Sequence, residues 1–295
     1  MPVCPIQNQG FIVQVFNTAA RLTEFIQNNK AQNPALKLGF VPTMGALHAG
    51  HMKLLHEARA KSDLVIVSVF VNPTQFNDPK DLDRYPRTLE ADVQLLEQNG
   101  CDAVYTPAVE DIYPNGTHTP YSIDFDGIDN VMEGAFRPGH FKGVAQVVER
   151  FFELVKPDIA FFGRKDFQQV AIIKQMVKVR QLPLQISEVS TARNTDGLAL
   201  SSRNTLLTPE QQEEALIIFK TLSNAVEWAK KTNDAAILKE KLVAFFNTGT
   251  LRLEYLEIAD NLTLQPVKQI VPGCTCCIAA FCGTVRLIDN MSLEG

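Results

Sequence analysis

The chain has 295 residues, of which 45% are hydrophobic, and a formal net charge of -5. This length suits two domains, and the apolar fraction is large enough to bury a core. A weakly acidic chain has no general attraction for nucleic acid or for an anionic membrane, so any bound phosphate needs a local positive site. Residues 1–10 lack the pattern of a secretory signal, and the longest apolar run, 64–71, is too short to span a bilayer. We therefore expect a cytoplasmic protein.

The six cysteines indicate free thiols rather than a disulfide framework, because nothing in this long chain suggests secretion. They are Cys4, Cys101, Cys274, Cys276, Cys277 and Cys282. The last four could instead build a metal- or redox-binding module, which is the non-enzyme alternative for this chain. Small neutral hydrophobes in a buried strand pair explain them better, and a zinc assay would separate the two interpretations.

Predicted strands and helices alternate over the first two thirds of the chain. Short apolar runs predict strands at 36–41, 64–71, 102–105, 159–162 and 184–189. Helical spacing of apolar residues, or runs of good helix formers, predict helices at 49–60, 89–99, 144–155 and 167–179. The polar stretch 72–88 is predicted to be a loop. This alternation indicates an α/β fold with a Rossmann-like, doubly wound parallel sheet.

The character of the chain changes after about Ser190. A capping-box pattern at Thr208 and Gln211 predicts the start of a long helix. The segments that follow are predicted to be a helix at 235–246, a half-exposed strand at 251–255 and a hairpin of 277–281 with 284–288. We expect a Rossmann-like nucleotide- and substrate-binding domain over 1–189 and a smaller α+β C-terminal lid domain over 190–295.

The first chemical motif is Pro-Thr-Met-Gly-Ala-Leu-His-Ala-Gly-His at 42–51, where a predicted strand ends and a helix begins. Ligands of open α/β sheets bind beyond the carboxyl ends of strands, and a helix start offers free N–H groups. His48 and His51 can donate hydrogen bonds to phosphate there, while Gly45 and Gly50 permit close approach of a nucleotide. The histidines could instead cap the helix or chelate zinc, but no third metal ligand lies nearby in the sequence.

Two further segments carry positive charge. Lys165 lies in Gly-Arg-Lys-Asp-Phe-Gln-Gln at 163–169 and would bring a point charge to a phosphate, although an ordinary solvated helix start explains that segment equally well. Ser201, Ser202 and Arg203 combine hydroxyls with a guanidinium that binds two phosphate oxygens at once. Taken by itself, this second segment could simply cap a turn. It lies, however, at the predicted domain boundary, where ligand sites concentrate.

Asn72 and Gln75 follow the strand predicted at 64–71. Their uncharged amides suit the hydroxyl and carboxylate groups of a small polar substrate. A plain adenylyltransferase, which transfers AMP to a phosphorylated acceptor, is the rival enzyme class. It would require more cations at this position, so the two neutral amides argue against it.

Together these motifs resemble the pantothenate synthetase family, one of the nucleotidyltransferase-fold enzymes. The matching segments occur in family order: Pro-Thr-Met-Gly-x-Leu-His-x-Gly-His at 42–51, Asn-Pro-x-Gln-Phe at 72–76, Tyr-Pro-Arg-Thr at 85–88, Glu-Gly-x-x-Arg-Pro-Gly-His-Phe at 133–141, Gly-x-Lys-Asp-x-Gln-Gln at 163–169 and Asp-Gly-Leu-Ala-x-Ser-Ser-Arg-Asn at 196–204. The combination is highly specific, whereas any one motif is not.

The resemblance implies an ATP-dependent ligase that joins pantoate to β-alanine through a pantoyl-adenylate, releases AMP and pyrophosphate, uses Mg²⁺ and is usually a homodimer. It implies ATP contacts from Met44, Gly45, Ala46, Leu47, His48, Ala49, Gly50, His51, Gly163, Arg164, Lys165, Asp166, Leu200, Ser201, Ser202 and Arg203. It also implies pantoate contacts from Gln75 and Gln169, with Gln75 near β-alanine. The expected catalytic residues are His48, His51, Lys165 and Arg203, and His51 matches the family's proton donor.

The chain departs from the family pattern at a few positions. Arg164 replaces a more usual acidic or amide residue, Asn194 a common Glu and Leu200 a common Met, but none of these changes removes a charge that the chemistry needs. Ala192 stands where a Val often packs on the adenine. Some members place magnesium-binding acids just after Tyr-Pro-Arg-Thr, and only Asp92 matches here, so no metal ligand is assigned.

Overall fold

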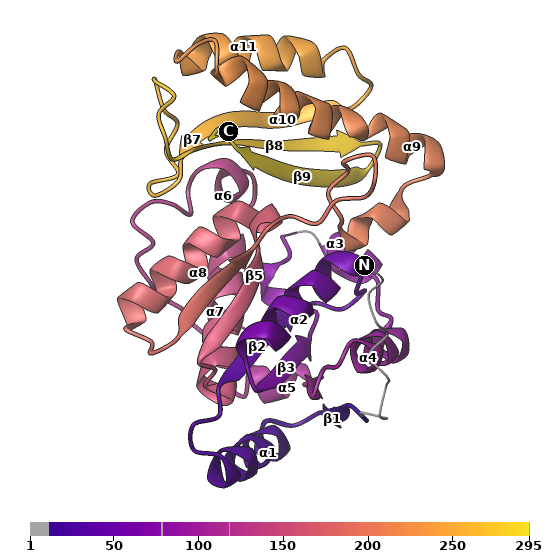
Figure 1. The fold of residues 1–295 in the computed structure, drawn as a ribbon, viewed down its shortest axis with the longest axis vertical. Helices are drawn as coiled ribbons and strands as arrows, with labels where there is room; N and C mark the ends of the chain where they lie inside the picture. The colour runs from indigo at the N-terminus through magenta and orange to yellow at the C-terminus, as the bar shows by residue number, and fades with distance from the viewer. Residues whose placement is uncertain (1–11, 78, 118, 295) are drawn as a thin grey trace, which may run out of the picture.

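The computed structural model describes residues 12–77, 79–117 and 119–294. Within them, a six-stranded, wholly parallel sheet forms the body of the molecule, in the order β1-β4-β3-β2-β5-β6 (Figure 1). Its strands are β1 (Gln14–Phe16), β2 (Leu38–Thr43), β3 (Leu64–Val69), β4 (Ala103–Tyr105), β5 (Ile159–Gly163) and β6 (Gln185–Val189). The parallel sheet predicted from the sequence is confirmed.

Helices cover both faces of this sheet. One face packs against α1 (Ala19–Gln32), α7 (His140–Val155) and α8 (Phe167–Arg180), and the other against α2 (Ala49–Lys61) and α4 (Leu89–Gln98). The connecting segments form short helices and 3-10 turns, namely η1 (Pro73–Gln75), α3 (Pro79–Arg84), α5 (Val109–Ile112), α6 (Met132–Phe136), η2 (Arg164–Asp166) and η3 (Ser202–Leu206).

The central strands are buried on both faces, which is why they occur in the sequence as continuous apolar runs. Phe40, Val65 and Ile66 are fully buried. The ring of Phe40 packs edge-on against Phe151 and Phe152 of α7, with ring centroids 5.7 and 6.5 Å away. Burial of each such side chain stabilises the fold by roughly 1.5–3 kcal/mol, so the strands that carry the site are firmly held.

The order of the strands reverses between β2 and β5. These two strands are neighbours, while β3 and β4 follow on one side of the pair and β6 lies on the other. Because all the strands are parallel, the loops that leave β2, β3 and β5 meet at the same edge of the sheet. Ligands of doubly wound sheets bind at such a point of reversal.

A second, antiparallel sheet in the order β7-β8-β9 lies above that edge (Figure 1). It consists of β7 (Arg252–Asp260), β8 (Cys274–Cys282) and β9 (Val285–Ser292), preceded in the chain by α9 (Pro209–Glu214), α10 (Leu216–Ala229) and α11 (Ala235–Phe246). Helices α10 and α11 pack on the face turned away from the parallel sheet. The smaller α+β C-terminal unit is therefore confirmed.

The described cysteines are free and buried, and Cys4 lies outside the described residues. Cys274, Cys276, Cys277 and Cys282 all lie on β8, within the predicted buried strand pair. Burial raises the pKa of the Cys276 thiol to about 12, so it remains neutral. Over the described ranges, no three or more His, Cys, Asp or Glu side chains gather so that they could hold a metal ion, and none of the helices has the length and apolar character of a membrane span.

Some elements were not predicted. β1 was missed because it has only three residues, and α1 because it buries only Leu22 and Ile26, too few to stand out as helical spacing. The stretch 72–88 was predicted to be a loop, but it contains η1 and α3. The long helix expected after Thr208 is two helices, α9 and α10, which meet at Ala215.

Candidate active site

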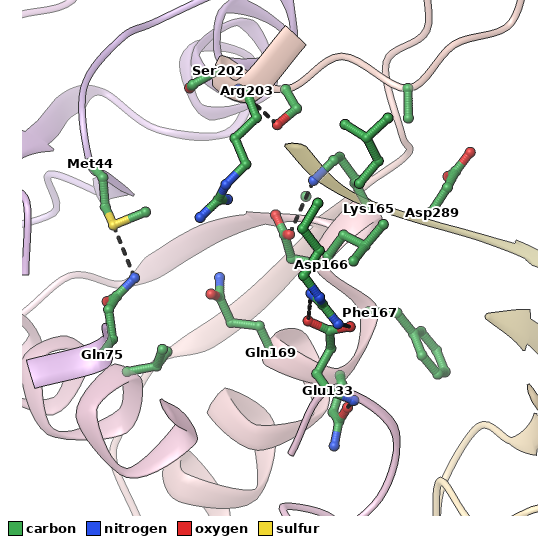
Figure 2. A pocket seen from close by; sticks show the side chains of 18 of the residues that line it. Met44, Gln75, Glu133, Lys165, Asp166, Phe167, Gln169, Ser202, Arg203 and Asp289 are labelled. Carbon is green, nitrogen blue, oxygen red and sulfur yellow. Dashed lines mark hydrogen bonds and ion pairs between the residues drawn. The ribbon is translucent and has the colours of Figure 1, made fainter. Parts of the chain in front are cut away.

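A cavity of about 920 Å³ lies between the carboxyl edge of the parallel sheet and the C-terminal sheet. It is lined by the loops after β2, β3 and β5, by the α6–α7 segment, by residues 189–203 and by β9. Figure 2 shows Gln75, Lys165 and Gln169 around this space, with Arg203 reaching in from the C-terminal side. Segments far apart in the sequence thus meet where the strand order reverses.

His48 and His51 stand at the start of α2. His48 is the N-cap residue, and its Nδ1 accepts a hydrogen bond from the Gly50 N–H at 3.0 Å. The Nδ1 of His51 accepts from the His48 N–H at 3.3 Å, so two imidazoles fill both roles of a capping box. Because both Nδ1 atoms accept, each neutral ring carries its proton on Nε2. Each ring therefore keeps a donor that the helix cap does not use, and capping and phosphate binding are compatible roles.

Both of these histidines are neutral near physiological pH. Burial, and then the positive charge of Lys165, lower the pKa of His48 to about 4. Burial lowers the pKa of His51 to about 3, with His48 and Lys165 as smaller causes. The pair therefore serves as hydrogen-bond donors rather than as cations, and Lys165 supplies positive charge beside them.

Asp92 of α4 holds the loop between β2 and α2. Its carboxylate accepts from the backbone N–H groups of Ala46 at 2.9 Å and Leu47 at 2.8 Å, and from the Thr88 hydroxyl at 3.2 Å. Asp92 is 3% exposed. Gly45, with φ at +81°, lets the chain turn tightly against this carboxylate. Asp92 therefore fixes the backbone that presents the two histidines.

Asn72 orients Gln75. The Asn72 side-chain amide donates to Gln75 Oε1 and to the Gly143 carbonyl, both at 3.1 Å, and its oxygen accepts from the Tyr113 hydroxyl at 2.7 Å. Asn72 thus binds only the oxygen of the Gln75 amide. The Gln75 Nε2 donates instead to the Met44 sulfur at 2.9 Å (Figure 2). Asn72 is engaged with the protein itself, and Gln75 presents the donor at the cavity wall.

Helix α7 approaches the Asn72–Gln75 turn very closely. A Cβ atom on Gly143 would lie 2.4 Å from the Thr74 carbonyl oxygen, far inside van der Waals contact. Only glycine permits the hydrogen bond between the Asn72 amide and the Gly143 carbonyl at this separation. The lack of a side chain at Gly143 thus lets α7 pack directly against the turn that carries Gln75.

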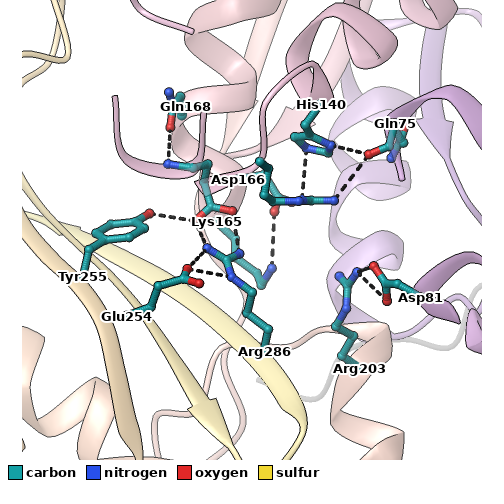
Figure 3. A network of polar contacts seen from close by, with 12 residues as sticks. Gln75, Asp81, His140, Lys165, Asp166, Gln168, Arg203, Glu254, Tyr255 and Arg286 are labelled. Atoms are coloured by element: carbon teal, nitrogen blue, oxygen red, sulfur yellow. Dashed lines mark hydrogen bonds and ion pairs between the residues drawn. The ribbon is translucent and has the colours of Figure 1, made fainter. Parts of the chain in front are cut away.

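His140 supports the same turn, and Arg137 contacts His140. His140 Nδ1 donates to the Gln75 carbonyl at 2.7 Å (Figure 3), and the Arg137 guanidinium donates to His140 Nε2 at 3.2 Å. Burial and the Arg137 charge lower the pKa of His140 to about 4, which keeps it neutral. The sequence pattern at 133–141 gave these residues no role, because a contact between a side chain and a distant carbonyl leaves no local signal.

Lys165 lies on η2, directly after β5. Its Nζ is 3.3 Å from Asp166 Oδ1, and its side chain is 17% exposed. Arg164 instead pairs with Glu188, with Nε 3.4 Å from Oε2. Asn290 of β9 donates to the main-chain oxygens of Arg164 and Lys165, each at 2.9 Å. The C-terminal sheet thus contacts the turn that carries the lysine.

Residues 192–203 form the C-terminal wall of the cavity. The Ser202 hydroxyl donates to the Ala46 carbonyl at 2.9 Å, which joins this wall to the β2–α2 loop. Arg203 pairs with Asp81 of α3, with Nη2 3.0 Å from Oδ2 (Figure 3). Both contacts bridge the N-terminal and C-terminal parts of the chain across the opening of the cavity.

Glu133 of α6 joins the N-terminal part of the molecule to the C-terminal sheet. Its carboxylate accepts from Arg286 at 2.7 and 2.8 Å and from the Tyr255 hydroxyl at 2.8 Å, and Arg286 also pairs with Glu254 (Figure 3). Burial opposes ionisation of Glu133, but Arg286 and Tyr255 outweigh it and hold its pKa below the ordinary value. This buried network fixes β7 and β9 against α6.

Known proteins are similar to this chain over nearly its whole length. A sequence model of the family described as pantoate-beta-alanine ligase matches residues 14–292. The chain belongs to this family. The pantothenate synthetase of Bacteroides fragilis is 48% identical over 287 residues, which is 96% of this chain and 99% of the relative. That of Aquifex aeolicus is 42% identical over 283 residues, or 95% of this chain and 99% of the relative.

Solved pantothenate synthetase structures share the fold. One from Thermus thermophilus aligns with a TM-score of 0.89 at 39% identity, covering 96% of this chain and all of the other. The pantoate-beta-alanine ligase of Francisella tularensis, described as complexed with beta-gamma ATP and beta-alanine, aligns with a TM-score of 0.79 at 35% identity, covering 96% of this chain and 98% of the other. The family resemblance is confirmed: the chain is a ligase of pantothenate formation.

Most of the site residues expected for this ligase family surround the cavity. Those that line it are Met44, His48, Gly50, His51, Asn72, Gln75, Gly163, Lys165, Asp166, Gln169, Ala192, Leu200, Ser201, Ser202 and Arg203. Gly45, Ala46, Leu47, Ala49 and Arg164 do not line it. The N–H groups of Ala46 and Leu47 are directed to Asp92, and Arg164 is directed to Glu188.

Proposed function

We propose that this ligase joins pantoate to β-alanine through a pantoyl-adenylate, with ATP converted to AMP and pyrophosphate. The observation that carries the proposal is that two kinds of polar side chain line one cavity. Donors to phosphate come from the ends of the adjacent strands β2 and β5, as the Nε2–H groups of His48 and His51 and the ammonium of Lys165. The neutral amides of Gln75 and Gln169 line the same space.

ATP is proposed as the nucleotide because a relative with the same fold is described as complexed with beta-gamma ATP and beta-alanine. The start of α2 suits a phosphate, since helix N-termini direct N–H groups and a positive dipole end toward an anion. Ala192 and Leu200 lie farther along the wall and provide apolar surface for a base. Gln75 and Gln169 are proposed to bind pantoate.

In the first step, the pantoate carboxylate attacks the α-phosphorus and the bond to pyrophosphate breaks. Negative charge then accumulates on the phosphoryl oxygens. We propose that this charge is stabilised by Lys165, Arg203 and the two neutral imidazoles. Of the two imidazoles, His51 is the more deeply buried donor. In the second step, the amine of β-alanine attacks the acyl carbon, loses a proton and displaces AMP. Neither step requires a covalent enzyme intermediate, so positioning and electrostatics supply the catalysis.

Mg²⁺ is proposed to enter with the triphosphate as part of the substrate. The described residues offer no cluster of three or more protein ligands, and both Asp92 oxygens accept backbone N–H bonds. Magnesium commonly binds to nucleotides with few protein ligands and several waters. We assign no protein group to it.

Residues 190–295 are proposed to act as a lid domain on a body formed by 1–189. Ser202 contacts the proposed body at the Ala46 carbonyl, and Arg203 contacts it at Asp81. Closure of this kind is common in ligases that must exclude water. Saturating ATP analogue with pantoate should slow hydrogen exchange over 192–204. Unchanged exchange there would argue against a lid.

The order of the reaction tests the proposal directly. If an adenylate forms, labelled pyrophosphate should exchange into ATP with pantoate and Mg²⁺ present and β-alanine absent. Exchange that strictly requires β-alanine would indicate a concerted reaction. Release of ADP and phosphate would indicate an acyl-phosphate ligase, and the assignment of both nucleotide motifs would then be abandoned.

We also propose a cytoplasmic location, as expected from the sequence, and a homodimer, which the family resemblance alone supports. Sedimentation of the purified protein at micromolar concentration would test the second. A single species with the mass of one chain would contradict it.

A further inference from the structure

Two consecutive residues of β9, Asp289 and Asn290, contact the two segments proposed to bind the nucleotide, residues 192–203 and the turn of Lys165. β9 pairs with β8 so that Asp289 is opposite Ile278 and Asn290 is opposite Cys277. Ile278 belongs to the apolar cluster under α10 and α11, whereas Cys277 belongs to that of the parallel sheet. Successive side chains of a strand point to opposite faces, so these two neighbours reach different partners.

Asn290 holds the turn that carries Lys165. Its side-chain N–H groups donate to the carbonyl oxygens of Arg164 and Lys165, each at 2.9 Å. The side chain is buried at 7% exposure. Consecutive carbonyls on a short 3-10 turn have few partners within the turn itself, so one amide that binds both fixes the direction in which the lysine leaves the backbone.

Asp289 holds the hairpin that leads into the Ser201–Ser202–Arg203 segment. It binds the Arg193 guanidinium through both oxygens, at 2.5 and 3.0 Å. Arg193 in turn donates to the Gly197 carbonyl at 3.0 Å and lies 5.1 Å above the ring of Phe219. A bidentate pair with 4% exposure of the aspartate is rigid, so it sets the hairpin and thereby the start of η3.

We propose that Asp289 and Asn290 are a pair of positioning residues that align the two nucleotide motifs of the site with each other from one strand. Neither residue is assigned a contact with substrate. Asn290 acts through Lys165 and Asp289 through residues 192–203, so the C-terminal sheet places both motifs when it rests on the body. This inference rests on the proposed role of Lys165 at a phosphate.

A double-mutant cycle separates this role from a merely structural one. Asn290→Ala should lower the rate of pantothenate formation by about 10- to 100-fold, the scale on which small displacements of a catalytic group act. In a Lys165→Ala background, the same substitution should cost less than about twofold, because the group that it positions is gone. A loss of the same factor in both backgrounds would overturn the proposal, as would full activity of Asn290→Ala.

The matched control is Thr275→Val on the neighbouring strand. Thr275 is fully buried and donates to Asn261 at 2.6 Å, but it lies outside the cavity lining. The control removes a partly buried hydrogen bond made by a residue of the same sheet and should leave the rate unchanged. If it lowers the rate as much as Asn290→Ala does, general loosening of the sheet explains both results and the proposal fails.

Hydrogen exchange of the variants gives an independent readout. Asn290→Ala should speed exchange at 163–167, and Asp289→Asn should speed it at 192–204. Faster exchange spread over β8 and β9 in both variants would overturn the proposal. Product analysis of the wild type separates the adenylate mechanism from the positioning role of Asp289 and Asn290. Release of ADP would refute the adenylate, but the double-mutant cycle, which measures pantothenate formation, would remain interpretable.

Discussion

The two walls of the cavity are built on different principles. On the body, His48 and His51 are held by hydrogen bonds within one helix start, and Asp92 from the next helix fixes the loop that precedes them. On the C-terminal side, Ser202 and Arg203 make further contacts across the opening, with the Ala46 carbonyl and with Asp81. The body wall is therefore held by contacts within the body, while the C-terminal wall also makes contacts across the opening.

Lys165 belongs to both walls, and removing it should have the largest effect. It projects from the body but its turn is held from β9. Lys165→Ala should lower the rate of adenylate formation by roughly 10²–10³ while the protein stays folded, as for loss of a preorganised donor in a phosphoryl site. Single-turnover kinetics would measure this. Turnover within about threefold of wild type would mean that Lys165 is only a surface residue.

Gln75 tests whether the body wall is specific for pantoate. Gln75→Ala should weaken pantoate binding by about 1.5–3 kcal/mol, the cost of losing a hydrogen bond to a charged carboxylate, and should hardly affect ATP. Asn72→Ala should show a smaller loss in the same direction, because it acts by orienting Gln75. Calorimetric titration of each ligand would distinguish the two. An equal loss for ATP and pantoate would contradict the assignment.

The body wall should also carry the acid sensitivity of the protein. The pKa values of His48 and His140 are lowered from 6.5 to about 4, and that of His51 to about 3. Below pH 6.5 the unfolded chain therefore binds protons that the folded protein does not, so the free energy of unfolding falls as the pH drops toward 4. Urea unfolding of His140→Gln should depend less steeply on pH across this window. Parallel curves for variant and wild type would contradict it.

The smallest effect is expected at the ion pair between Asp81 and Arg203. Asp81 and Arg203 have side-chain exposures of 41% and 28%, and such exposed pairs contribute about 0.2–1 kcal/mol. Asp81→Asn should therefore change the KM for ATP by less than about fivefold and make it less sensitive to salt. A loss as large as that of Lys165→Ala would show that closure depends on this single pair.

The parallel sheet and its ligand edge were predictable because β2 and β3 are apolar along their length and Gly, Pro and His motifs follow the strand ends. The cap formed by His48 and His51 was open to prediction from the same pattern. The contacts of Asp289, Asn290 and Asp92 were not, because each depends on a partner at least 45 residues away in the chain. Long-range polar contacts leave no period in the sequence, whereas buried strands do.

The tight turn between β8 and β9 has a consequence for the proposed nucleotide site. Only Gly283 and Thr284 join the strands, and this length fixes Cys282 opposite Val285 and every pair beyond it. One inserted residue would slip β9 by one position, and a slip of one exchanges the faces of all its side chains. Asp289 would then take the place of Asn290 beside the two carbonyl oxygens at Lys165, and Ile288 would take the place of Asp289 beside Arg193. The length of an exposed turn therefore decides which chemical group reaches each half of the site, and it should tolerate substitution far better than insertion.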